Sequence, residues 1–277
     1  MTRLKSTDVI DIGTGLQEYD AMLRARTGGT LLEIACHAHK VDSKSLSGRI
    51  AVTSIGIIPM TCGQGLICGF AEAVGRITAH MGFNTFITEH TDAAGMAEAF
   101  EKKAGIIMLA DDNRFVALNI KKYKVIDNAV ATARGFAAGL DMMTGGVAGK
   151  KCLVIGCGPV GQHAAAALLN FGAVVSVYDR DRQRSVAVHK AIHHQYDVRM
   201  TVEESLESAF GNHRILFDAT NSAGVIKEKN IMPDTFIAAP GMPLGLSDAA
   251  RAGIGGRLLH DPLQTGVACM AVKAAAI

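Results

Sequence analysis

The sequence predicts an α/β protein made of two domains, the second of which carries a doubly wound parallel sheet. Strand and helix patterns alternate along both halves of the chain, which is typical of parallel sheets covered by helices. An apolar segment beginning at Lys151 runs into a glycine-rich turn, and Gly145-Gly146 just before it offers a hinge. The 277 residues are 49% hydrophobic and include 30 glycines, a composition that suits two α/β domains.

The first domain is assigned to residues 1–145 and repeats the order strand, loop and helix. Apolar residues at helical spacing predict an N-terminal helix from Ser6 to about Arg26, and a β-branched run predicts a strand from Arg49 to Thr61. The other expected elements are a helix at 66–77, a strand at 83–88, a helix at 93–104, a strand at 105–110, a hairpin of 115–119 and 125–127, and a helix at 129–143.

The second domain is assigned to residues 146–261. Its strands are expected near 152–155, 174–178, 198–201, 215–219, 236–239 and 257–260, with helices between them. Residues 262–277 form a further helical pattern with no strand to follow it, so we expect this C-terminal helix to pack back on the N-terminal domain. Closure of this kind leaves a cleft between the two domains, where a ligand can bind.

The glycine-rich turn after Lys151 has the pattern that binds a dinucleotide in a Rossmann-type domain. Gly156 allows a tight turn, Gly158 lets the backbone approach a pyrophosphate, and Gly161 lets the following helix pack close to the strand. Pro159 and Val160 lie at the start of that helix, whose N-terminus faces the anion. The turn therefore predicts a nicotinamide dinucleotide as cofactor.

Asp179 and Arg180 bear on which dinucleotide binds. Asp179 ends the next expected strand, where a carboxylate binds the ribose hydroxyls of NAD and repels the 2′-phosphate of NADP. Arg180 and Arg182 argue the other way, because an arginine just past the acid can grip that phosphate. We expect NAD.

Two more loops follow strands of the second domain. Ligands of a doubly wound sheet bind beyond the carboxyl ends of its strands, so Thr220 and Asn221 and also Pro240 and Gly241 are expected to border the cofactor. A capping turn remains an alternative for the first pair and a rigid loop for the second. His260 also follows a strand, and it either faces the cleft or caps the last helix.

Strand ends of the first domain supply the candidate substrate site. Thr61, Cys62 and Gly63 form a loop after one strand, and Asp111 directly follows the apolar strand at 105–110. Partial desolvation at that place would strengthen the attraction of Asp111 for a cationic group. The alternative is a turn or cap aspartate, a role expected more of Asp112 than of Asp111.

Composition excludes several classes of protein. The net charge is only +2 with no basic run, so no nucleic acid is expected as partner. No apolar stretch is long enough to cross a membrane and no signal-peptide core is present, so a cytoplasmic protein with reduced cysteines is expected. The His37/His39 and His189/His193 pairs lack a third ligand nearby in sequence, so no metal is expected.

Four motifs in this order resemble those of the pyrrolysine synthases, the dehydrogenases of the last step of pyrrolysine biosynthesis. They are Pro59-Met-Thr-Cys-Gly63, the segment from Ile107 to Phe115, the glycine turn at 156–161, and Ala239-Pro-Gly-Met-Pro243. Asn128 adds to this resemblance, which extends over nearly the whole chain.

The resemblance implies an NAD-dependent oxidation of L-lysine that carries 3-methyl-D-ornithine on its ε-nitrogen. The carbon bearing the ornithine δ-amine would be oxidised to an imine, water or the ornithine α-amine would attack, and ammonia release would accompany closure of the pyrroline ring. Asp111 would hold the ammonium group, Asn128 and the Thr61–Gly63 loop would bind the amide and the rest of the substrate, and Leu4 would begin the substrate cover.

Two other functions fit the same motifs. The chain could be a dehydrogenase of another amine, an amino acid or a C1-carrier substrate, or it could be a non-catalytic NAD-sensing module. The exposed helices of the first domain could also pair two chains, so a homodimer is one expectation.

Overall fold

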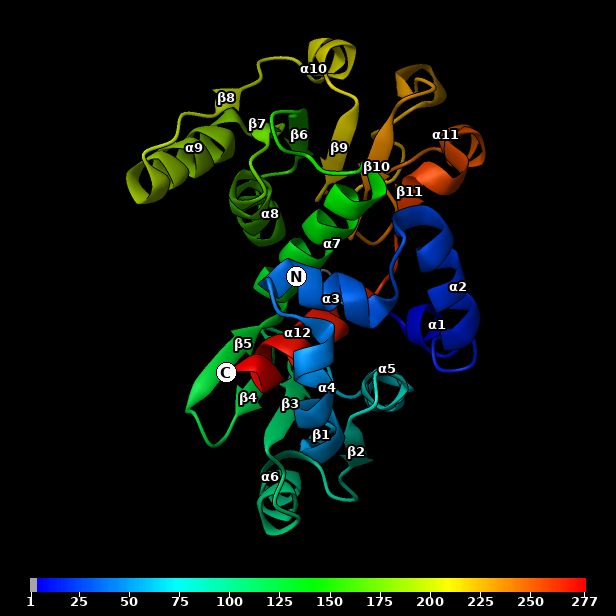
Figure 1. The fold of residues 1–277 in the computed structure, drawn as a ribbon, viewed down its shortest axis with the longest axis vertical. Coiled ribbons are helices and arrows are strands. Elements are labelled where there is room, and N and C mark those ends of the chain that lie inside the picture. The colour runs from blue at the N-terminus through cyan, green and yellow to red at the C-terminus, as the bar shows by residue number, and fades with distance from the viewer. Residues whose placement is uncertain (1–3) are drawn as a thin grey trace.

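The computed structural model describes residues 4–277 and contains two sheets separated by a layer of helices. In Figure 1 the five-stranded sheet occupies the lower half and the six-stranded sheet the upper half. Helices α3 (Leu31–His39), α7 (Asn128–Met143) and α12 (Gln264–Ala276) lie between them. The α/β class expected from the alternating patterns is confirmed.

The N-terminal sheet has the order β2-β1-β3-β4-β5. Strands β1 (Ser54–Ile58), β2 (Asn84–Ile87) and β3 (Ile106–Ala110) are parallel, whereas β4 (Phe115–Asn119) and β5 (Lys124–Asp127) form the expected hairpin. β1 and β3 are nearly continuous runs of apolar residues because helices cover them, as in other parallel sheets.

The C-terminal sheet has the order β11-β10-β9-β6-β7-β8, with every pair parallel. Its strands are β6 (Lys151–Ile155), β7 (Val174–Tyr178), β8 (Thr201–Val202), β9 (Ile215–Asp218), β10 (Phe236–Ala238) and β11 (Leu258–Leu259). The chain first builds outward from β6 and then returns to the other side of it at β9. This is the doubly wound order, and its switch point between β6 and β9 is where ligands bind.

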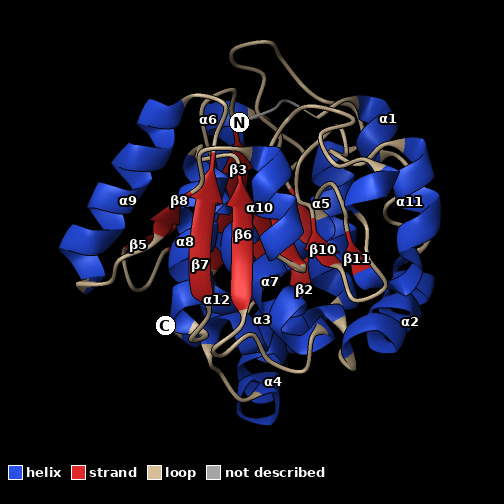
Figure 2. Cartoon of the chain, turned by 90° about the horizontal axis from the view of Figure 1, so that it is seen from above, coloured by secondary structure: helices blue, strands red, loops and turns tan. Residues whose placement is uncertain are grey.

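Helices surround the strands of both sheets, as Figure 2 shows from above. They are α5 (Phe70–His80), α6 (Asp92–Glu101), α8 (Pro159–Asn170), α9 (Arg182–Tyr196), α10 (Leu206–Asn212) and α11 (Asp248–Ile254), with 3₁₀ turns at Glu228–Asn230 and Gly255–Arg257. The helix expected from residue 66 begins only at Phe70, because Gly69 has a positive φ of 83°. The strand expected at 198–201 is β8, which begins at Thr201.

The N-terminal segment differs most from the prediction. The single helix expected from Ser6 to Arg26 is two helices, α1 (Ser6–Val9) and α2 (Leu16–Thr27), because the glycines between them interrupt the pattern. Two further helices, α3 (Leu31–His39) and α4 (Ser43–Val52), were not expected. The predicted strand start at Arg49 is wrong, because Asp42 caps α4 by accepting a hydrogen bond from the Ser45 amide and the helix continues to Val52.

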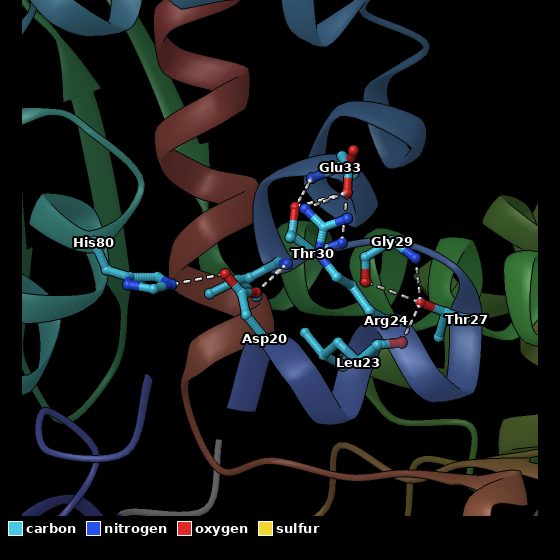
Figure 3. A network of polar contacts seen from close by, with 9 residues as sticks. Asp20, Leu23, Arg24, Thr27, Gly29, Thr30, Glu33 and His80 are labelled. Atoms are coloured by element: carbon cyan, nitrogen blue, oxygen red, sulfur yellow. Dashed lines mark hydrogen bonds and ion pairs between the residues drawn. The ribbon is translucent and has the colours of Figure 1, made fainter. Parts of the chain in front are cut away.

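A polar network fixes these N-terminal helices to the rest of the protein. Asp20 of α2 lies 2.7 Å from Nε2 of His80 on α5, and its other oxygen accepts a hydrogen bond of 2.7 Å from the Leu31 amide at the start of α3 (Figure 3). Thr30 and Glu33 form a reciprocal capping box at the same end of α3. One carboxylate thus joins three helices.

The long helix α7 (Asn128–Met143) and the C-terminal helix α12 (Gln264–Ala276) form the centre of the molecule. A Cβ added at Gly135 would lie 2.6 Å from the Cys269 sulfur, so the two helices touch through a glycine. α12 also packs on α3, α4, α5 and the β3–β5 strands. The expectation that the C-terminal helix returns to the N-terminal half is confirmed.

Candidate functional site

A cleft of about 1060 Å³ opens between the two sheets. The glycine turn, the ends of β7 and β9, and the loop after β10 line its C-terminal side. The ends of β1 and β3, the start of α5, and residues of α7 and α12 line its N-terminal side. The cleft therefore lies where the carboxyl ends of the parallel strands of both sheets meet, as expected for a ligand site.

The glycine turn has the geometry that a pyrophosphate requires. Gly156 follows β6 with a φ of 91°, and a Cβ at Gly161 would lie only 1.8 Å from the Gly156 carbonyl oxygen. A Cβ at Gly158 would meet no atom within 4 Å, so this glycine borders open space in the cleft. Pro159 begins α8 and Val160 follows it, and both line the cleft. The turn fits a dinucleotide, with helix N–H groups free for its phosphates.

Asp179 lies at the end of β7 and lines the cleft together with Arg180. Its Oδ2 accepts a hydrogen bond of 2.7 Å from the Cys157 amide, and its Oδ1 accepts one of 2.9 Å from the Asp181 amide. These bonds hold the carboxylate beside the glycine turn. Arg184 also lines the cleft, 3.5 Å from an oxygen of Asp181, and the sequence analysis did not find it.

The Thr220 loop is held by Asp218, the last residue of β9. Oδ1 of Asp218 accepts hydrogen bonds from the amide and the hydroxyl of Thr220, at 3.0 and 2.7 Å. The capping turn that was the alternative is therefore present, and Thr220 and Asn221 line the cleft as well. Asp218 is fully buried, burial raises the pKa of its carboxyl, and its Oδ2 has no hydrogen-bond partner among residues 4–277.

Pro240 and Gly241 follow β10 and line the cleft beside the Thr220 loop. A Cβ at Gly241 would lie 2.0 Å from the Thr220 carbonyl oxygen, so the two loops touch through this glycine. Nδ1 of His260 lies 2.6 Å from the Ala239 carbonyl oxygen, and His260 is not part of the cleft lining. Its position supports a structural role for His260.

Asp111 lines the substrate side of the cleft, but not in the environment expected for it. The expectation of partial desolvation is wrong, because Asp111 is exposed in the turn between β3 and β4. Its Oδ1 accepts hydrogen bonds of 2.8 and 2.7 Å from the amides of Asn113 and Arg114, and these bonds lower the pKa of its carboxyl. Asp111, not Asp112, is therefore the residue that caps this turn.

The loop after β1 only partly reaches the cleft. Cys62 is exposed and lines it, whereas Thr61 donates hydrogen bonds to Asp92 through its amide and its hydroxyl. Gly63 lies against the Asp112 side chain, whose Oδ2 accepts a hydrogen bond of 2.7 Å from the Gln64 amide. Neither Thr61 nor Gly63 is part of the lining.

Leu4 and Asn128 both line the cleft, on the same side as Asp111. Oδ1 of Asn128 accepts a hydrogen bond of 3.2 Å from the Thr132 hydroxyl one turn further along α7. Gly266 of α12 packs so closely that an added Cβ would lie 2.8 Å from that Oδ1 atom. The side chain is thus positioned by two helices.

Asp261 and Glu72 are cleft residues that the sequence analysis missed. Asp261 is buried at the start of α12, where its carboxylate accepts hydrogen bonds of 2.6 Å from the hydroxyls of both Tyr19 and Thr265. Burial and the Asp261 charge raise the pKa of Tyr19 well above its usual value, so Tyr19 stays a neutral donor. The contact between Asp261 and Tyr19, 242 residues away in the chain, could not be found from local patterns.

Charge is divided unevenly along the cleft. Among the described residues that line it, the cations are Arg180, which follows Asp179 in the chain, and Arg184, which lies 3.5 Å from Asp181. The other side carries carboxylates, namely Glu72, Asp111, Asp112 and Asp261, with no lysine, arginine or histidine in the described lining. Because a cluster of like charges in a cleft raises the local concentration of counter-ions, this side favours a cationic ligand.

Two further observations concern metals and membranes. Within residues 4–277, no cluster of three or more histidine, cysteine, aspartate or glutamate side chains is placed to hold a metal ion. His37 instead contacts Asp141, and His189 and His193 stack with ring centroids 6.3 Å apart. None of the helices in the described part of the chain is long and apolar enough to span a membrane.

Two family models and two curated relatives match this chain. Residues 8–126 match the N-terminal domain family of the pyrrolysine biosynthesis protein PylD, and residues 125–232 match the C-terminal domain family of alanine dehydrogenase and PNT. Pyrrolysine synthase of Methanosarcina acetivorans is 33% identical over 98% of both chains, and that of Methanosarcina barkeri is 30% identical over 98% of this chain and 97% of its own.

Solved structures of similar fold are more distant in sequence. Quinate dehydrogenase from Corynebacterium glutamicum in complex with NAD is 17% identical with a TM-score of 0.57, covering 80% of this chain and 93% of its own. Shikimate dehydrogenase from Aquifex aeolicus is 15% identical with a TM-score of 0.53, covering 81% and 96%. At such identities these structures support the two-sheet fold alone.

Proposed function

This chain belongs to the pyrrolysine synthase family, and from that membership and its cleft we propose that it oxidises the ornithine δ-amine of L-lysine-Nε-3-methyl-D-ornithine with NAD, releases ammonia and closes the pyrroline ring of pyrrolysine. The predictions of an oxidoreductase and of an NAD-type cofactor are confirmed. We also propose that residues 1–145 with 262–277 form the substrate domain and residues 146–261 the dinucleotide domain.

The uneven charge of the cleft is the observation that carries the proposal. The substrate has amino groups that are cationic at neutral pH, and the substrate side of the described cleft is lined by carboxylates. Ammonium groups bind carboxylates through charge-assisted hydrogen bonds, which are stronger than neutral ones. A substrate rich in amines therefore matches this half of the cleft, and an anionic one does not.

The cofactor is assigned to the C-terminal side. Gly156, Gly158 and the start of α8 would hold the pyrophosphate, and Asp179 would bind the ribose hydroxyls, which favours NAD over NADP. The Thr220–Asn221 and Pro240–Gly241 loops would border the rest of the dinucleotide. When bound there, NAD supplies the hydride acceptor for the amine oxidation.

We assign to Asp111 the binding of the substrate ammonium group whose carbon is oxidised. A carboxylate offers about four acceptor sites, so the two amides on Oδ1 leave room for an ammonium group. An ammonium nitrogen has no lone pair to expel hydride, so it must first lose a proton, and Asp111 would take that proton or relay it to water. The hydrogen bonds that lower its pKa keep Asp111 ionised to bind the ammonium group, and they make it a weak base, so the proton would pass on to water.

We assign to Asn128 and the loop around Cys62 the binding of the substrate's amide and of the rest of the substrate. The hydroxyl of Thr132 fixes the Asn128 side chain, so its amide is oriented before the substrate arrives. Once the carbon is oxidised to an imine, attack by the ornithine α-amine closes a five-membered ring and expels ammonia. Cys62 has no histidine beside it in the described lining, so it is assigned a lining role.

The proposal is tested by measuring NADH formation with a set of amines. Purified protein and NAD are mixed with the lysyl-methylornithine amide, free ornithine or free lysine, and absorbance is followed. We expect turnover with the amide and little with the two amino acids, together with one pyrroline ring and one ammonia per NADH.

The alternatives give different results in the same assay. Preference for a free amino acid would indicate another amine dehydrogenase. NAD binding without turnover of any amine would indicate a sensing module. Either result would contradict the proposed reaction.

A further inference from the structure

The substrate side of the cleft contains a carboxylate that the rest of the described chain leaves without a partner. Glu72 is exposed and lines the cleft, and it makes no hydrogen bond or ion pair with any of residues 4–277. The other carboxylates of this side, Asp111, Asp112 and Asp261, all accept hydrogen bonds from other residues of the protein. Within the described lining, Glu72 is therefore the carboxylate whose acceptor sites are all free of protein donors.

The fold holds Glu72 near the turn that carries Asp111. Glu72 is the third residue of α5, which begins at Phe70. The Phe70 ring packs edge-on against the Phe115 ring, with centroids 5.3 Å apart. Phe115 in turn pairs with Ala110 in the β3–β4 ladder, directly before Asp111. The first turn of α5 therefore lies beside the Asp111 turn, and both line the cleft.

A second helix shows what a glutamate at this helix position does without a ligand. Glu18 is likewise the third residue of its helix, α2, and it is exposed outside the described cleft lining. Negative charge in the first turn of a helix is favoured by the helix dipole, and this effect is common to Glu18 and Glu72. The two differ in that Glu72 faces the cleft, so a comparison of the two isolates what Glu72 does there.

The substrate of the proposed function offers Glu72 a cation. Besides the δ-amine assigned to Asp111, it carries the ornithine α-amine and the lysine α-amine, and amino groups are ionised at neutral pH. No arginine, lysine or histidine lines this side of the cleft within the described residues, so no protein cation there competes for Glu72. An ammonium group and a carboxylate form a charge-assisted hydrogen bond.

We propose that Glu72 binds a second ammonium group of the substrate, one whose carbon is not oxidised, and thereby selects substrates with two cationic groups. This inference rests on the proposed function. The group bound to Glu72 takes no part in hydride transfer, so the contact is the same before and during that step. Binding of this kind lowers KM and leaves kcat nearly unchanged.

The two amines that Glu72 could bind differ in what happens to them. The lysine α-ammonium stays charged throughout the reaction. The ornithine α-amine must lose its proton before it can close the ring, and a carboxylate bound to it favours the charged form. Substrate analogues that lack one or the other amine distinguish the two sources.

The test is the steady-state rate of NADH formation with the lysyl-methylornithine amide, measured for the unaltered protein, Glu72→Gln and Glu18→Gln. Glutamine keeps the size of the side chain and removes its charge. We expect KM to rise about fivefold in Glu72→Gln with kcat within about twofold, because a charge-assisted hydrogen bond is lost at an exposed site. Glu18→Gln should change neither constant, and the two variants should have similar melting temperatures, because each loses one charge at the same helix position.

The analogues complete the test. One lacks the lysine α-amine, and the other lacks the ornithine α-amine and can still be oxidised, although it cannot close the ring. The effect of Glu72→Gln on KM should disappear with one analogue and persist with the other, and the analogue with which it disappears identifies the group that Glu72 binds.

The inference and the proposed function fail in different ways. Turnover by the unaltered protein together with an unchanged KM in Glu72→Gln would overturn the inference alone. A rise in KM that is equal for the substrate and both analogues would also overturn it, as would a loss of kcat as large as that in Asp111→Asn. No turnover of the amide by the unaltered protein would overturn the proposed function and this inference with it.

Discussion

The two sides of the cleft are built in different ways. The dinucleotide side consists mainly of backbone, since Gly156 and Gly161 allow a tight turn and Gly158 borders open space beside the N-terminus of α8. The substrate side relies on side chains from β3, α5, α7 and α12, brought together from distant parts of the chain. A substitution in the glycine turn changes the backbone itself, so it affects folding as well as binding. A substitution on the substrate side can remove one charge or one hydrogen bond and leave the backbone unchanged. The predictions below use this difference.

The largest effect is expected from Asp111→Asn. The amide keeps Oδ1 to accept from Asn113 and Arg114, so the β3–β4 turn should fold normally. It loses the charge that binds the ammonium group and the site that accepts its proton, so kcat should fall by about 100-fold or more. Steady-state kinetics with the lysyl-methylornithine amide and a separate measurement of NAD affinity check this, and NAD affinity should not change. Activity equal to that of the unaltered protein would remove Asp111 from the reaction.

The glycine turn offers a matched pair of variants. Gly161→Ala places a Cβ 1.8 Å from the Gly156 carbonyl oxygen, so it should destabilise the fold by about 1–3 kcal/mol. Gly158→Ala meets no protein atom, so the melting temperature should be unchanged while NAD binds about tenfold or more weakly. Thermal melts and NAD titrations separate the two effects. Normal NAD affinity in Gly158→Ala would place the pyrophosphate elsewhere.

Asp179→Ser should change the choice of dinucleotide rather than catalysis. Removing the carboxylate ends its repulsion of a 2′-phosphate, so the preference for NAD over NADP should fall by about tenfold. The ratio of kcat/KM for the two cofactors measures this. Arg180→Gln is the control, because it removes a cation from the same region and should shift the ratio in the opposite direction. An unaltered ratio in Asp179→Ser would contradict the ribose assignment.

The smallest effect is expected on the pH dependence of stability, and it concerns Asp218, a buried side chain on the dinucleotide side of the cleft. Burial raises the pKa of its carboxyl in the folded protein, so the protonated form is favoured on folding. The stability it contributes is present below its unfolded-state pKa and is lost as pH rises through the folded-state pKa. Asp218→Asn has no such titration, so the unaltered protein should lose stability relative to this variant as the pH rises above the ordinary aspartate pKa of about 4. Unfolding curves at several pH values check it, and a constant difference would show that Asp218 does not titrate there.

The difference between a backbone-built dinucleotide side and a substrate side built from distant side chains also explains what the sequence could predict. The glycine turn, the strand before it and Asp179 are contiguous or nearly so, and local rules of turn and helix geometry were sufficient to place them. The strand and helix order of both sheets was also predictable, since apolar runs and periodicity are local.

Sequence rules failed where local patterns conflict or contacts are distant. The β-branched residues Ile50 and Val52 favoured a strand, but the Asp42 cap makes them the end of α4. Asp111 follows an apolar strand yet is exposed, because a tight turn carries it out of the core. Asp261 accepts a hydrogen bond from Tyr19, which lies 242 residues away in the chain, so no local pattern could reveal this contact.

A crystal structure with NADH and the lysyl-methylornithine amide tests the central claim most directly, because it shows both sides of the cleft at once. NADH in place of NAD prevents turnover, so the amide stays intact. We expect the pyrophosphate at the Gly156–Gly161 turn and the ornithine δ-nitrogen within hydrogen-bond distance of Asp111. A δ-nitrogen bound away from the carboxylates, or an amide bound outside the cleft, would contradict the account.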